Sequence, residues 1–353
     1  MAEKVLMKGN EAMAESAIRA GCRYFFGYPI TPQTELSAYM SKMMPKFDGC
    51  FLQAESEISA INMVYGASAA GARVMTSSSS PGISLKTEGI SYMAGADLPG
   101  VIVNVQRGGP GLGSIQPSQA DYWQATRALG HGDMHVPVYA PSTVQEMADY
   151  AYHAFDVADQ YRTPVLIIAD GLLGQMMEPV EMPEYRNELP EKPWATVGHQ
   201  HKRKHNIANS LYLTADELED LVIERFKRYK RIEETEQRWE SFMLDDAQIV
   251  IVAYGASARI SRSAIAVARE KGIKVGLLRP ITLWPFPQKA FEECKQAKAF
   301  LSVEMNMGQM IDDVRLSVGN GIEVEHFGRT GGNIPTPDEV LVRIEEMNEK
   351  VGA

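Results

Sequence analysis

The sequence predicts an α/β protein with two doubly wound units, each built on a parallel sheet. Three observations lead to this fold class. Short apolar runs alternate with stretches of helical length throughout the first half of the chain. A proline-rich stretch and a highly charged stretch follow, and the alternation then returns near the C-terminus. Alternation at this spacing is typical of βαβ units, in which successive strands lie parallel.

The first unit begins with two helices whose starts are marked by capping residues. Asn10 is predicted to cap the first helix, which ends at Gly21. Thr31 is predicted to cap the second helix, with Pro32 at its first helical position, where proline is favoured. The expected strands are 24–28, 50–53, 73–76, 101–105 and 164–169, and the remaining helices are 57–70, 81–94 and 142–159.

Two capping boxes mark later helix starts. In such a box, a hydroxyl side chain and the side chain of a Gln or Glu three residues later accept hydrogen bonds from the free backbone N–H groups at the helix N-terminus. Ser142 and Gln145 form the first box, and Thr214 and Glu217 form the second. The second box begins a long charged helix that runs to about residue 239. We expect this helix to bridge domains or to contact a partner.

The second unit is expected to begin near Asp246, after a linker at 178–192 that is rich in proline and acidic residues. A helix from Ser257 to about residue 271 lies between two of its apolar runs. Its strands are expected at 248–253, 274–278 and 299–303. The predicted organisation is a first domain at 1–185, a linker with the charged helix at 186–245 and a second domain at 246–353.

The charge balance excludes several classes of function. The chain carries 35 Lys and Arg against 45 Asp and Glu, a formal net charge of −10. Such an acidic chain lacks the excess of Lys and Arg that gives a positively charged surface to proteins that bind nucleic acid or anionic membranes. No apolar run reaches the length of a membrane span, and the first residues lack the apolar core of a signal peptide. We therefore expect a cytoplasmic protein with no nucleic-acid or membrane partner.

Cysteine and histidine usage argues against a metal or cluster held by this chain alone. The cysteines Cys22, Cys50 and Cys294 are far apart, whereas an iron–sulfur cluster needs four thiolates. The histidines of segment 199–205 are spaced irregularly among lysine and arginine, which favours a solvated loop over a metal site. Any cluster chemistry would therefore come from a partner chain.

Three polar side chains follow predicted strands and carry the candidate chemistry. Thr31 comes after the first strand, Glu57 after the second and Arg107 after the fourth. The carboxyl ends of parallel strands meet at one edge of a sheet, where α/β proteins bind their ligands. The sequence therefore predicts a site at which a hydroxyl, a carboxylate and a guanidinium converge.

Each of these residues also has a purely structural interpretation. Thr31 can serve only as a helix cap, Glu57 can serve the dipole of its helix, and Arg107 can be a surface residue beside a loop. The turns after Glu57 are apolar, and a carboxyl group at an apolar rim suits proton exchange with a heterocycle nitrogen. Arginine suits bidentate binding of a carboxylate.

The glycine-rich and serine-rich segments match no nucleotide-binding fingerprint. Gly109, Gly111 and Gly113 have the spacing G-x-G-x-G, whereas a dinucleotide site needs G-x-G-x-x-G. A nicotinamide cofactor is therefore disfavoured. The run 77–82 either donates backbone N–H groups to an anion or forms a polar turn.

These motifs together resemble the α subunit of 2-oxoacid:ferredoxin oxidoreductases, which use thiamine diphosphate and coenzyme A. The sequence is most similar to the subunit for 3-methyl-2-oxobutanoate and other branched-chain 2-oxoacids, with 2-oxoglutarate or pyruvate as alternative substrates. The resemblance implies a pyrimidine-type thiamine-diphosphate-binding domain followed by a transketolase C-terminal-like domain. The segments that carry it are 8–12, 27–32, 55–71, 101–109, 276–287 and 303–308.

The resemblance also implies roles for individual residues. Glu57 matches the glutamate that hydrogen-bonds the aminopyrimidine ring of the cofactor, and segment 64–67 favours it over Glu55. Thr31 matches a threonine that contacts the substrate, and Arg107 matches the arginine that pairs with the 2-oxoacid carboxylate. No metal ligand is expected in this chain. The implied cofactor contacts are Glu57, Pro29, Ile30, Ser80 and Gly82.

Partner chains are implied as well. A β subunit would hold the diphosphate and Mg²⁺, since this sequence lacks the Gly-Asp-Gly segment that such a site uses. A γ subunit, a small ferredoxin-like subunit with [4Fe–4S] clusters and ferredoxin itself would complete a dimer of heteromers. Coenzyme A would be a substrate, and acyl-CoA and CO₂ the products. The alternative from another class is a non-catalytic scaffold subunit.

Overall fold

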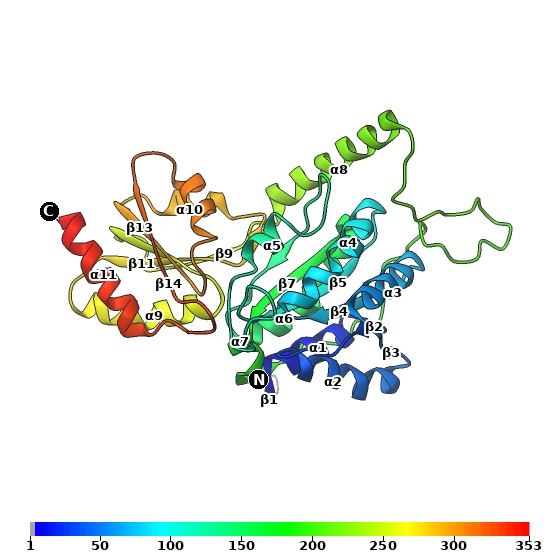
Figure 1. The fold of residues 1–353 in the computed structure, drawn as a ribbon, viewed down its shortest axis with the longest axis horizontal. Helices are drawn as coiled ribbons and strands as arrows, with labels where there is room; N and C mark the ends of the chain where they lie inside the picture. Colours follow the sequence, from blue (N-terminus) through cyan, green and yellow to red (C-terminus); the bar gives the residue numbers. More distant parts are fainter. Residues whose placement is uncertain (1–3, 353) are drawn as a thin grey trace.

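A seven-stranded sheet and a five-stranded sheet form two halves of the molecule, which lie side by side in Figure 1. The structure is a computed structural model and describes residues 4–352. A separate two-stranded sheet pairs β1 (Lys4–Lys8) antiparallel with β8 (Met177–Glu181).

The first sheet consists, in spatial order, of β12 (Thr282–Trp284), β6 (Val138–Tyr139), β7 (Pro164–Asp170), β5 (Gly100–Gln106), β4 (Val74–Ser78), β2 (Tyr24–Gly27) and β3 (Cys50–Gln53). Its strands are parallel except for β12, which pairs antiparallel with β6. Strands β4, β5 and β7 are buried at every position, as expected for central parallel strands between two layers of helices.

The helices of the first half are α1 (Gly9–Arg19), α2 (Thr34–Met43), α3 (Glu57–Ala69), α4 (Ser80–Gly95), α5 (Tyr122–Thr126), α6 (Val144–Tyr161) and α7 (Gly171–Gln175), with a short 3-10 helix at Met44–Phe47. Alternate residues of a strand point to opposite faces of the sheet. On β5, Ile102 packs in one core with α3 and α4, whereas Val101 and Val103 pack in another with α1, α2 and α6. Helices α3 and α4 therefore lie next to each other on one face (Figure 1).

Two of the predicted helix starts are wrong. Asn10 lies inside α1, whose N-cap is Lys8, and its amide donates to the carbonyl oxygen of Pro32 at 2.9 Å. Thr31 does not cap α2, because the N-cap is Gln33, which makes no side-chain capping hydrogen bond. The Pro32 carbonyl is thus held by a side chain from another helix, and α2 begins only after this turn.

Of the two predicted capping boxes, only the first is formed, one residue from its predicted position, whereas the second marks a helix start without the box. Helix α6 is capped by Thr143, one residue later than predicted, and its hydroxyl accepts a hydrogen bond from the Glu146 N–H at 3.0 Å. The Glu146 carboxylate in turn accepts one from the Ser142 N–H at 2.7 Å. The charged helix is α8 (Ala215–Thr235), which follows Thr214 as predicted but without a side-chain cap, and ends before residue 239. No described helix, α8 included, is long and apolar enough to span a lipid bilayer.

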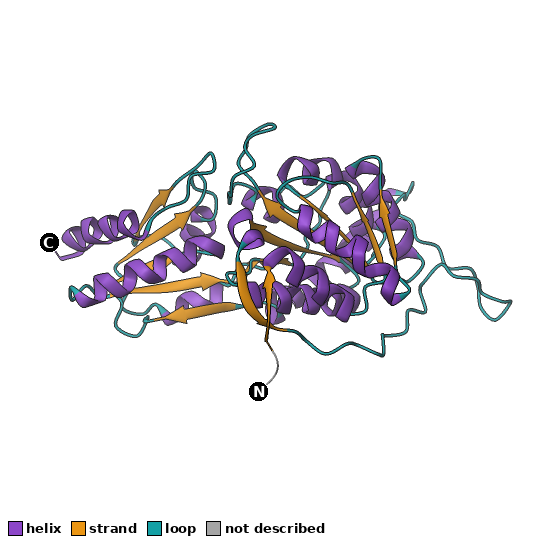
Figure 2. Cartoon of the chain, turned by 90° about the horizontal axis from the view of Figure 1, so that it is seen from below, coloured by secondary structure: helices purple, strands orange, loops and turns teal. Residues whose placement is uncertain are grey.

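Part of the predicted linker is a strand. Residues 177–181 form β8, which pairs along its whole length with β1, a strand that the sequence did not predict. These two segments lie far apart in the chain, so their pairing depends on the rest of the fold. After β8, residues 182–214 contain neither helix nor strand, and part of this segment projects from the body of the molecule (Figure 2).

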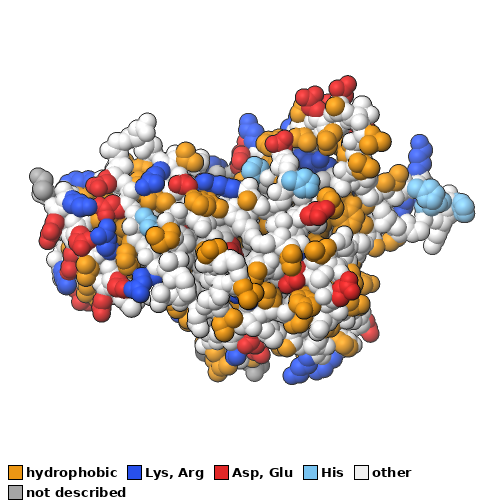
Figure 3. Space-filling view, viewed as in Figure 1, with side chains coloured by type: hydrophobic (Ala, Val, Ile, Leu, Met, Phe, Trp, Pro, Cys, Tyr) orange, Lys and Arg blue, Asp and Glu red, His pale blue; other side chains and the backbone are white. Residues whose placement is uncertain are grey.

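The histidines of segment 199–205 lie on this projecting segment, where Figure 3 shows pale-blue and blue side chains together. The ring centroid of His199 is 4.2 Å from that of His205 and 5.3 Å from that of His201. Within residues 4–352, no group of three or more His, Cys, Asp or Glu side chains is arranged to hold a metal ion.

The second sheet consists, in spatial order, of β14 (Glu323–Gly328), β13 (Ala299–Glu304), β10 (Ile249–Val252), β11 (Val275–Pro280) and β9 (Trp239–Phe242). Its strands are parallel except for β9, which pairs antiparallel with β11. Helix α9 begins two residues before the predicted Ser257. The helices of this half are α9 (Gly255–Glu270), α10 (Ile311–Val318) and α11 (Pro337–Gly352), with a 3-10 helix at Gln288–Glu293.

Two strands cross the predicted boundaries of the chain. Strand β12 follows the second-half strands β10 and β11 in the chain yet belongs to the first sheet, and β9 comes from the predicted linker yet belongs to the second sheet. The division of the chain at residues 185 and 245 stays a prediction.

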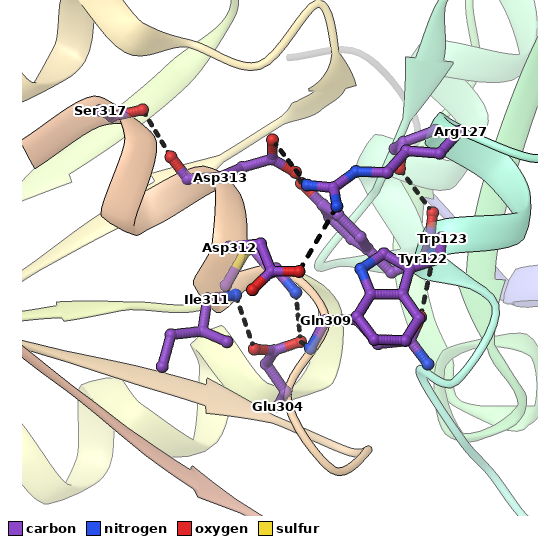
Figure 4. Close-up of polar contacts among 11 residues, drawn as sticks. Tyr122, Trp123, Arg127, Glu304, Gln309, Ile311, Asp312, Asp313 and Ser317 are labelled. Atoms are coloured by element: carbon purple, nitrogen blue, oxygen red, sulfur yellow. Dashed lines mark hydrogen bonds and ion pairs between the residues drawn. The ribbon is translucent and has the colours of Figure 1, made fainter.

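Polar contacts also join the halves, and Figure 4 shows one group of them. Glu304, the last residue of β13, accepts a hydrogen bond from the Gln309 N–H at 3.1 Å. The Gln309 side chain then accepts one from the backbone N–H of Trp123 at 2.9 Å. Arg127 pairs with Asp313 at 3.1 Å across the same boundary. The second half therefore holds in place the segment that follows β5, which forms part of the candidate site.

Candidate active site

The carboxyl ends of β2, β3, β4 and β5 bring the predicted site residues to one edge of the first sheet. These four strands are neighbours, so the loops that follow them share one rim. Arg107 follows β5, and its Nη1 donates a hydrogen bond at 3.0 Å to the carbonyl oxygen of Thr31, in the loop after β2. Glu57, after β3, lies against Gly82, after β4. The structure thus places the three residues that the sequence singled out at one rim, with Arg107 bonded to Thr31 and Glu57 packed against Gly82.

Glu57 is buried without a hydrogen-bond donor from the described part of the chain. It is the first residue of α3, and only 6% of its surface is exposed. The helix is capped by Ser56, so the Glu57 carboxyl is not needed for that purpose. Glu55 differs, because it is exposed and accepts a hydrogen bond from Ser59. The carboxyl is therefore free to bind a ligand, and a ligand with an N–H group or a protonated ring nitrogen would satisfy it.

Gly82 provides the space that the Glu57 carboxyl occupies. A Cβ atom at position 82 would lie 2.1 Å from the Ser78 Oγ and 2.6 Å from the Glu57 Oε1. No side chain fits there while Glu57 keeps its position. The hydroxyl groups of Ser78 and Ser79 are buried and have no hydrogen-bond partner among the described residues. The floor of the site therefore has unused polar groups beside Glu57.

Arg107 carries a buried positive charge with no carboxylate partner among residues 4–352. Its Nη1 and Nη2 donate to the carbonyl oxygens of Thr31 and Leu112, at 3.0 and 3.1 Å. Its Nε is buried and has no acceptor in the described part of the chain. A guanidinium that is held in place by carbonyl groups and not neutralised by an acid suits the binding of an anion.

Ser80 is tied into the fold through its hydroxyl group. The Ser80 Oγ donates to Asp121 at 2.5 Å and accepts from the Arg107 N–H at 3.0 Å. Burial raises the pKa of the Asp121 carboxyl, while hydrogen bonds from Ser80 and Asn104 oppose this shift. Ser80 therefore positions the loop that carries Arg107. A direct contact between its hydroxyl and a cofactor stays a prediction.

The loop after β2 forms the outer part of the rim. Thr31 and Pro29 are exposed there, and Ile30 is half-buried. All three lie on the segment whose carbonyl group Arg107 holds. Their predicted contacts with substrate and cofactor stay predictions, but their position at the rim is compatible with such contacts.

Sequence analysis missed two buried polar residues near this site. Asn104 interrupts the apolar strand β5 and donates to Asp121 at 2.8 Å. Lys86 lies on the buried stripe of α4, together with Gly82 and Gly89. The signals were present, since a polar residue inside an apolar strand and a lysine on an apolar helix face are both unusual.

Comparison with known proteins agrees with this architecture. Residues 15–240 match the family described as pyruvate flavodoxin/ferredoxin oxidoreductase, thiamine diphosphate-binding. Residues 247–340 match the pyruvate:ferredoxin oxidoreductase core domain II. Ketoisovalerate oxidoreductase subunit VorB from Methanothermobacter thermautotrophicus is 51% identical over 97% of this chain and 97% of its own length. This chain belongs to the 2-oxoacid:ferredoxin oxidoreductase family.

More distant relatives of the family fit the same fold. The 2-oxoglutarate synthase subunit KorA from the same organism is 35% identical over 99% of this chain and 100% of its own length. The structure of 2-oxoglutarate:ferredoxin oxidoreductase from Magnetococcus marinus is 26% identical, with a TM-score of 0.88, over 98% of this chain and 66% of that chain. A split-gene transketolase, at 15% identity and a TM-score of 0.60, shares the fold alone. The predicted fold class is thus confirmed.

Proposed function

We propose that this chain is the α subunit of a complex that oxidatively decarboxylates a 2-oxoacid to acyl-CoA and CO₂ and reduces ferredoxin. The observation that carries the proposal is the buried Glu57 carboxyl without a donor, at the same rim as the Arg107 guanidinium without a carboxylate partner. The preferred substrate in this proposal is 3-methyl-2-oxobutanoate, which is also named 2-ketoisovalerate. The name of the 51% identical relative supports this choice over 2-oxoglutarate or pyruvate.

The residues present fit the pyrimidine half of thiamine diphosphate. Glu57 offers an unpaired carboxyl, Gly82 leaves space beside it, and the free hydroxyl group of Ser78 lies next to Gly82. When bound, thiamine diphosphate supplies the nucleophilic carbon that attacks the 2-oxo group and stores the electron pair left by CO₂. Glu57 would accept a hydrogen bond from a ring nitrogen of the cofactor. The shared proton would stay on that nitrogen.

Arg107 and Thr31 would act on the substrate. The guanidinium would pair with the carboxylate of the 2-oxoacid, because it is buried, held by two carbonyl groups and free of any acid in the described chain. Thr31 would offer its exposed hydroxyl from the rim loop. Ser80 and Asp121 would keep the Arg107 loop in place, so the carboxylate is fixed before CO₂ leaves.

Partner chains would complete the catalytic cycle. A β subunit would hold the diphosphate and Mg²⁺, and subunits with [4Fe–4S] clusters would carry electrons to ferredoxin. The names of the relatives as subunits support such an assembly. A γ subunit and a dimer of heteromers are also part of the proposal. The proposal also includes a cytoplasmic location and an anaerobic cell, the latter because iron–sulfur clusters are sensitive to oxygen.

The proposal is tested by anaerobic purification of the chain with its natural partners. The purified complex is assayed for CoA-dependent reduction of a viologen dye with a panel of 2-oxoacids. We expect 3-methyl-2-oxobutanoate to be used at a higher kcat/KM than 2-oxoglutarate or pyruvate. A different preferred 2-oxoacid would overturn the substrate choice alone. A complex that retains its clusters and thiamine diphosphate but reduces no dye with any 2-oxoacid would contradict the catalytic role and favour a scaffold subunit.

Replacing Gly82 by alanine is expected to lower kcat by about 10²-fold, because the new methyl group displaces the Glu57 carboxyl. Gly66→Ala is the matched control, since Gly66 lies in the neighbouring helix α3 and a Cβ there meets no atom within 4 Å. We expect the control to keep its activity and to gain about 0.5–1 kcal/mol in stability. Steady-state assays and thermal unfolding of both complexes check the prediction, and equal kcat values would contradict it.

A further inference from the structure

The loop that carries Arg107 begins and ends at the same place in the fold. It leaves β5 at Arg107 and returns at Pro117, which forms an antiparallel β-bridge with Arg107. The Gly108 N–H also donates to the Gln116 carbonyl oxygen at 3.0 Å, which closes the base of the loop. The chain then continues into residues 118–123, the connecting segment. The position of Arg107 therefore depends on what holds this segment.

Gln119 is fully buried, and both its backbone and its side chain bind the second half of the molecule. The backbone N–H donates to the Met305 carbonyl oxygen at 3.1 Å, and the Gln119 carbonyl oxygen accepts from the Asn306 amide at 2.7 Å. The side-chain amide donates to the Tyr254 carbonyl oxygen at 2.9 Å and accepts from the Ser257 hydroxyl at 2.8 Å. A buried amide that is satisfied on every side has a fixed position. Gln119 therefore fixes the connecting segment to the second half.

Gln309, in the loop between β13 and α10, binds the connecting segment on both sides of Asp121. Its amide donates to the Ala120 carbonyl oxygen at 2.8 Å. Its side-chain oxygen accepts from the Trp123 N–H at 2.9 Å, a contact that Figure 4 shows. One half-buried side chain of the second half therefore holds the two backbone groups that flank Asp121.

Asp121 connects this segment to the rim of the site. Its carboxylate accepts hydrogen bonds from the Ser80 hydroxyl at 2.5 Å and from the Asn104 amide at 2.8 Å. Its N–H donates to the side chain of Gln106, the last residue of β5, at 3.2 Å. The Ser80 hydroxyl in turn accepts from the Arg107 N–H at 3.0 Å. Hydrogen bonds thus lead from the second half, through Asp121 and Ser80, to the backbone of Arg107.

We propose that Gln119 and Gln309 are positioning residues for the 2-oxoacid, which fix the Arg107 guanidinium where it pairs with the substrate carboxylate. The inference rests on the proposed function of Arg107. A guanidinium binds a carboxylate through two parallel hydrogen bonds only when its plane is correctly directed. A displacement of about 1 Å, caused far from the reacting atoms, can cost about 10²-fold in rate. The contact between the two halves would thus set the affinity for the 2-oxoacid.

The test measures KM for 3-methyl-2-oxobutanoate in the assembled, anaerobically purified complex. Gln309→Ala removes the bonds to Ala120 and Trp123 from a half-buried side chain, so the complex should still fold. We expect this variant to raise the KM for the 2-oxoacid by about 5-fold, and Gln119→Leu to raise it by about 10-fold or more. The kcat and the KM for CoA should stay at their wild-type values. An unchanged KM for the 2-oxoacid in Gln309→Ala would overturn the inference.

A double variant shows whether the effect passes through Arg107. In the Arg107→Ala complex no guanidinium is left to position, so adding Gln309→Ala should raise the KM for the 2-oxoacid no further. Equal fold-increases with and without Arg107 would show that Gln309 acts independently of it. That result would contradict the inference.

Arg259→Ala is the matched control, because it also weakens the contact between the two halves. Arg259, on α9, pairs with Glu178 of β8 at 2.9 Å, and both residues lie outside the Arg107 loop and the connecting segment. We expect a wild-type KM for the 2-oxoacid. If Arg259→Ala raised this KM as much as Gln309→Ala, any loosening between the halves would suffice, and the specific role of the two glutamines would be wrong.

A failure of the proposed function gives a different result. If Arg107→Ala itself leaves the KM for every 2-oxoacid unchanged, the carboxylate-binding role of Arg107 fails, and the inference fails with it. If Arg107→Ala raises this KM while Gln309→Ala and Gln119→Leu do not, the inference about the glutamines fails alone.

Discussion

The Glu57→Gln complex is expected to assemble normally and to lose about 10²–10⁴-fold in kcat with every 2-oxoacid. Glutamine keeps the shape of the side chain, so the packing against Gly82 is retained. It cannot carry the negative charge or exchange a proton with the ring nitrogen of the cofactor. The loss should therefore appear in kcat more than in KM. Dye-reduction assays at saturating thiamine diphosphate and CoA measure it.

The chain offers a closely matched control for this variant. Glu55 lies two residues earlier, is exposed and accepts a hydrogen bond from Ser59. Glu55→Gln introduces the same chemical change outside the buried site, and we expect its kcat to match the wild type. If Glu57→Gln turned over as fast as Glu55→Gln, the assignment of the cofactor-binding carboxyl to Glu57 would be wrong.

The Arg107→Ala complex is expected to raise the KM for the 2-oxoacid by about 10–10²-fold, because a charge-assisted hydrogen-bonded pair contributes about 1.5–3 kcal/mol. The KM for CoA should stay unchanged. Arg107 also holds the carbonyl groups of Thr31 and Leu112, so alanine loosens the rim as well. Arg107→Lys keeps the positive charge but loses the planar, bidentate guanidinium. Its KM for the 2-oxoacid should lie between the KM of the wild type and that of Arg107→Ala.

A remote arginine separates substrate binding from general effects on assembly. Arg127 lies after α5 and pairs with Asp312 and Asp313 across the contact shown in Figure 4. Arg127→Ala removes an exposed arginine outside the rim, and we expect no change in the KM for the 2-oxoacid. If the Arg107→Ala complex kept the wild-type KM for every 2-oxoacid tested, Arg107 would be excluded as the carboxylate-binding group.

Much of the fold could be predicted because apolar strands and glycine-terminated helices leave local signals. The strands at 50–53 and 101–105 and the helix after Glu57 lie within a residue or two of their predicted positions. The start of α2 could not be predicted, since Thr31 and Pro32 have the pattern of a helix start. The contact that overrides this pattern comes from Asn10, in another helix.

The candidate site followed from one general rule together with three residues. Because the carboxyl ends of parallel strands share an edge, Thr31, Glu57 and Arg107 were expected to meet, and the structure places them at one rim. The supporting residues were not predicted. The role of Ser80 depends on Asp121, which lies far away in the sequence and is brought close only by the segment after β5.

The sequence by itself determined the alternation of strands and helices, the edge at which the polar residues gather and the absence of clustered cysteine ligands. These features depend on local periodicity and on residue type. Only the tertiary structure decided that β1 pairs with β8, that β12 crosses to the first sheet and that Gly82 lies against Glu57. Each of these depends on contacts between distant segments, whose free energy comes from burial and charge pairing once the whole chain has folded.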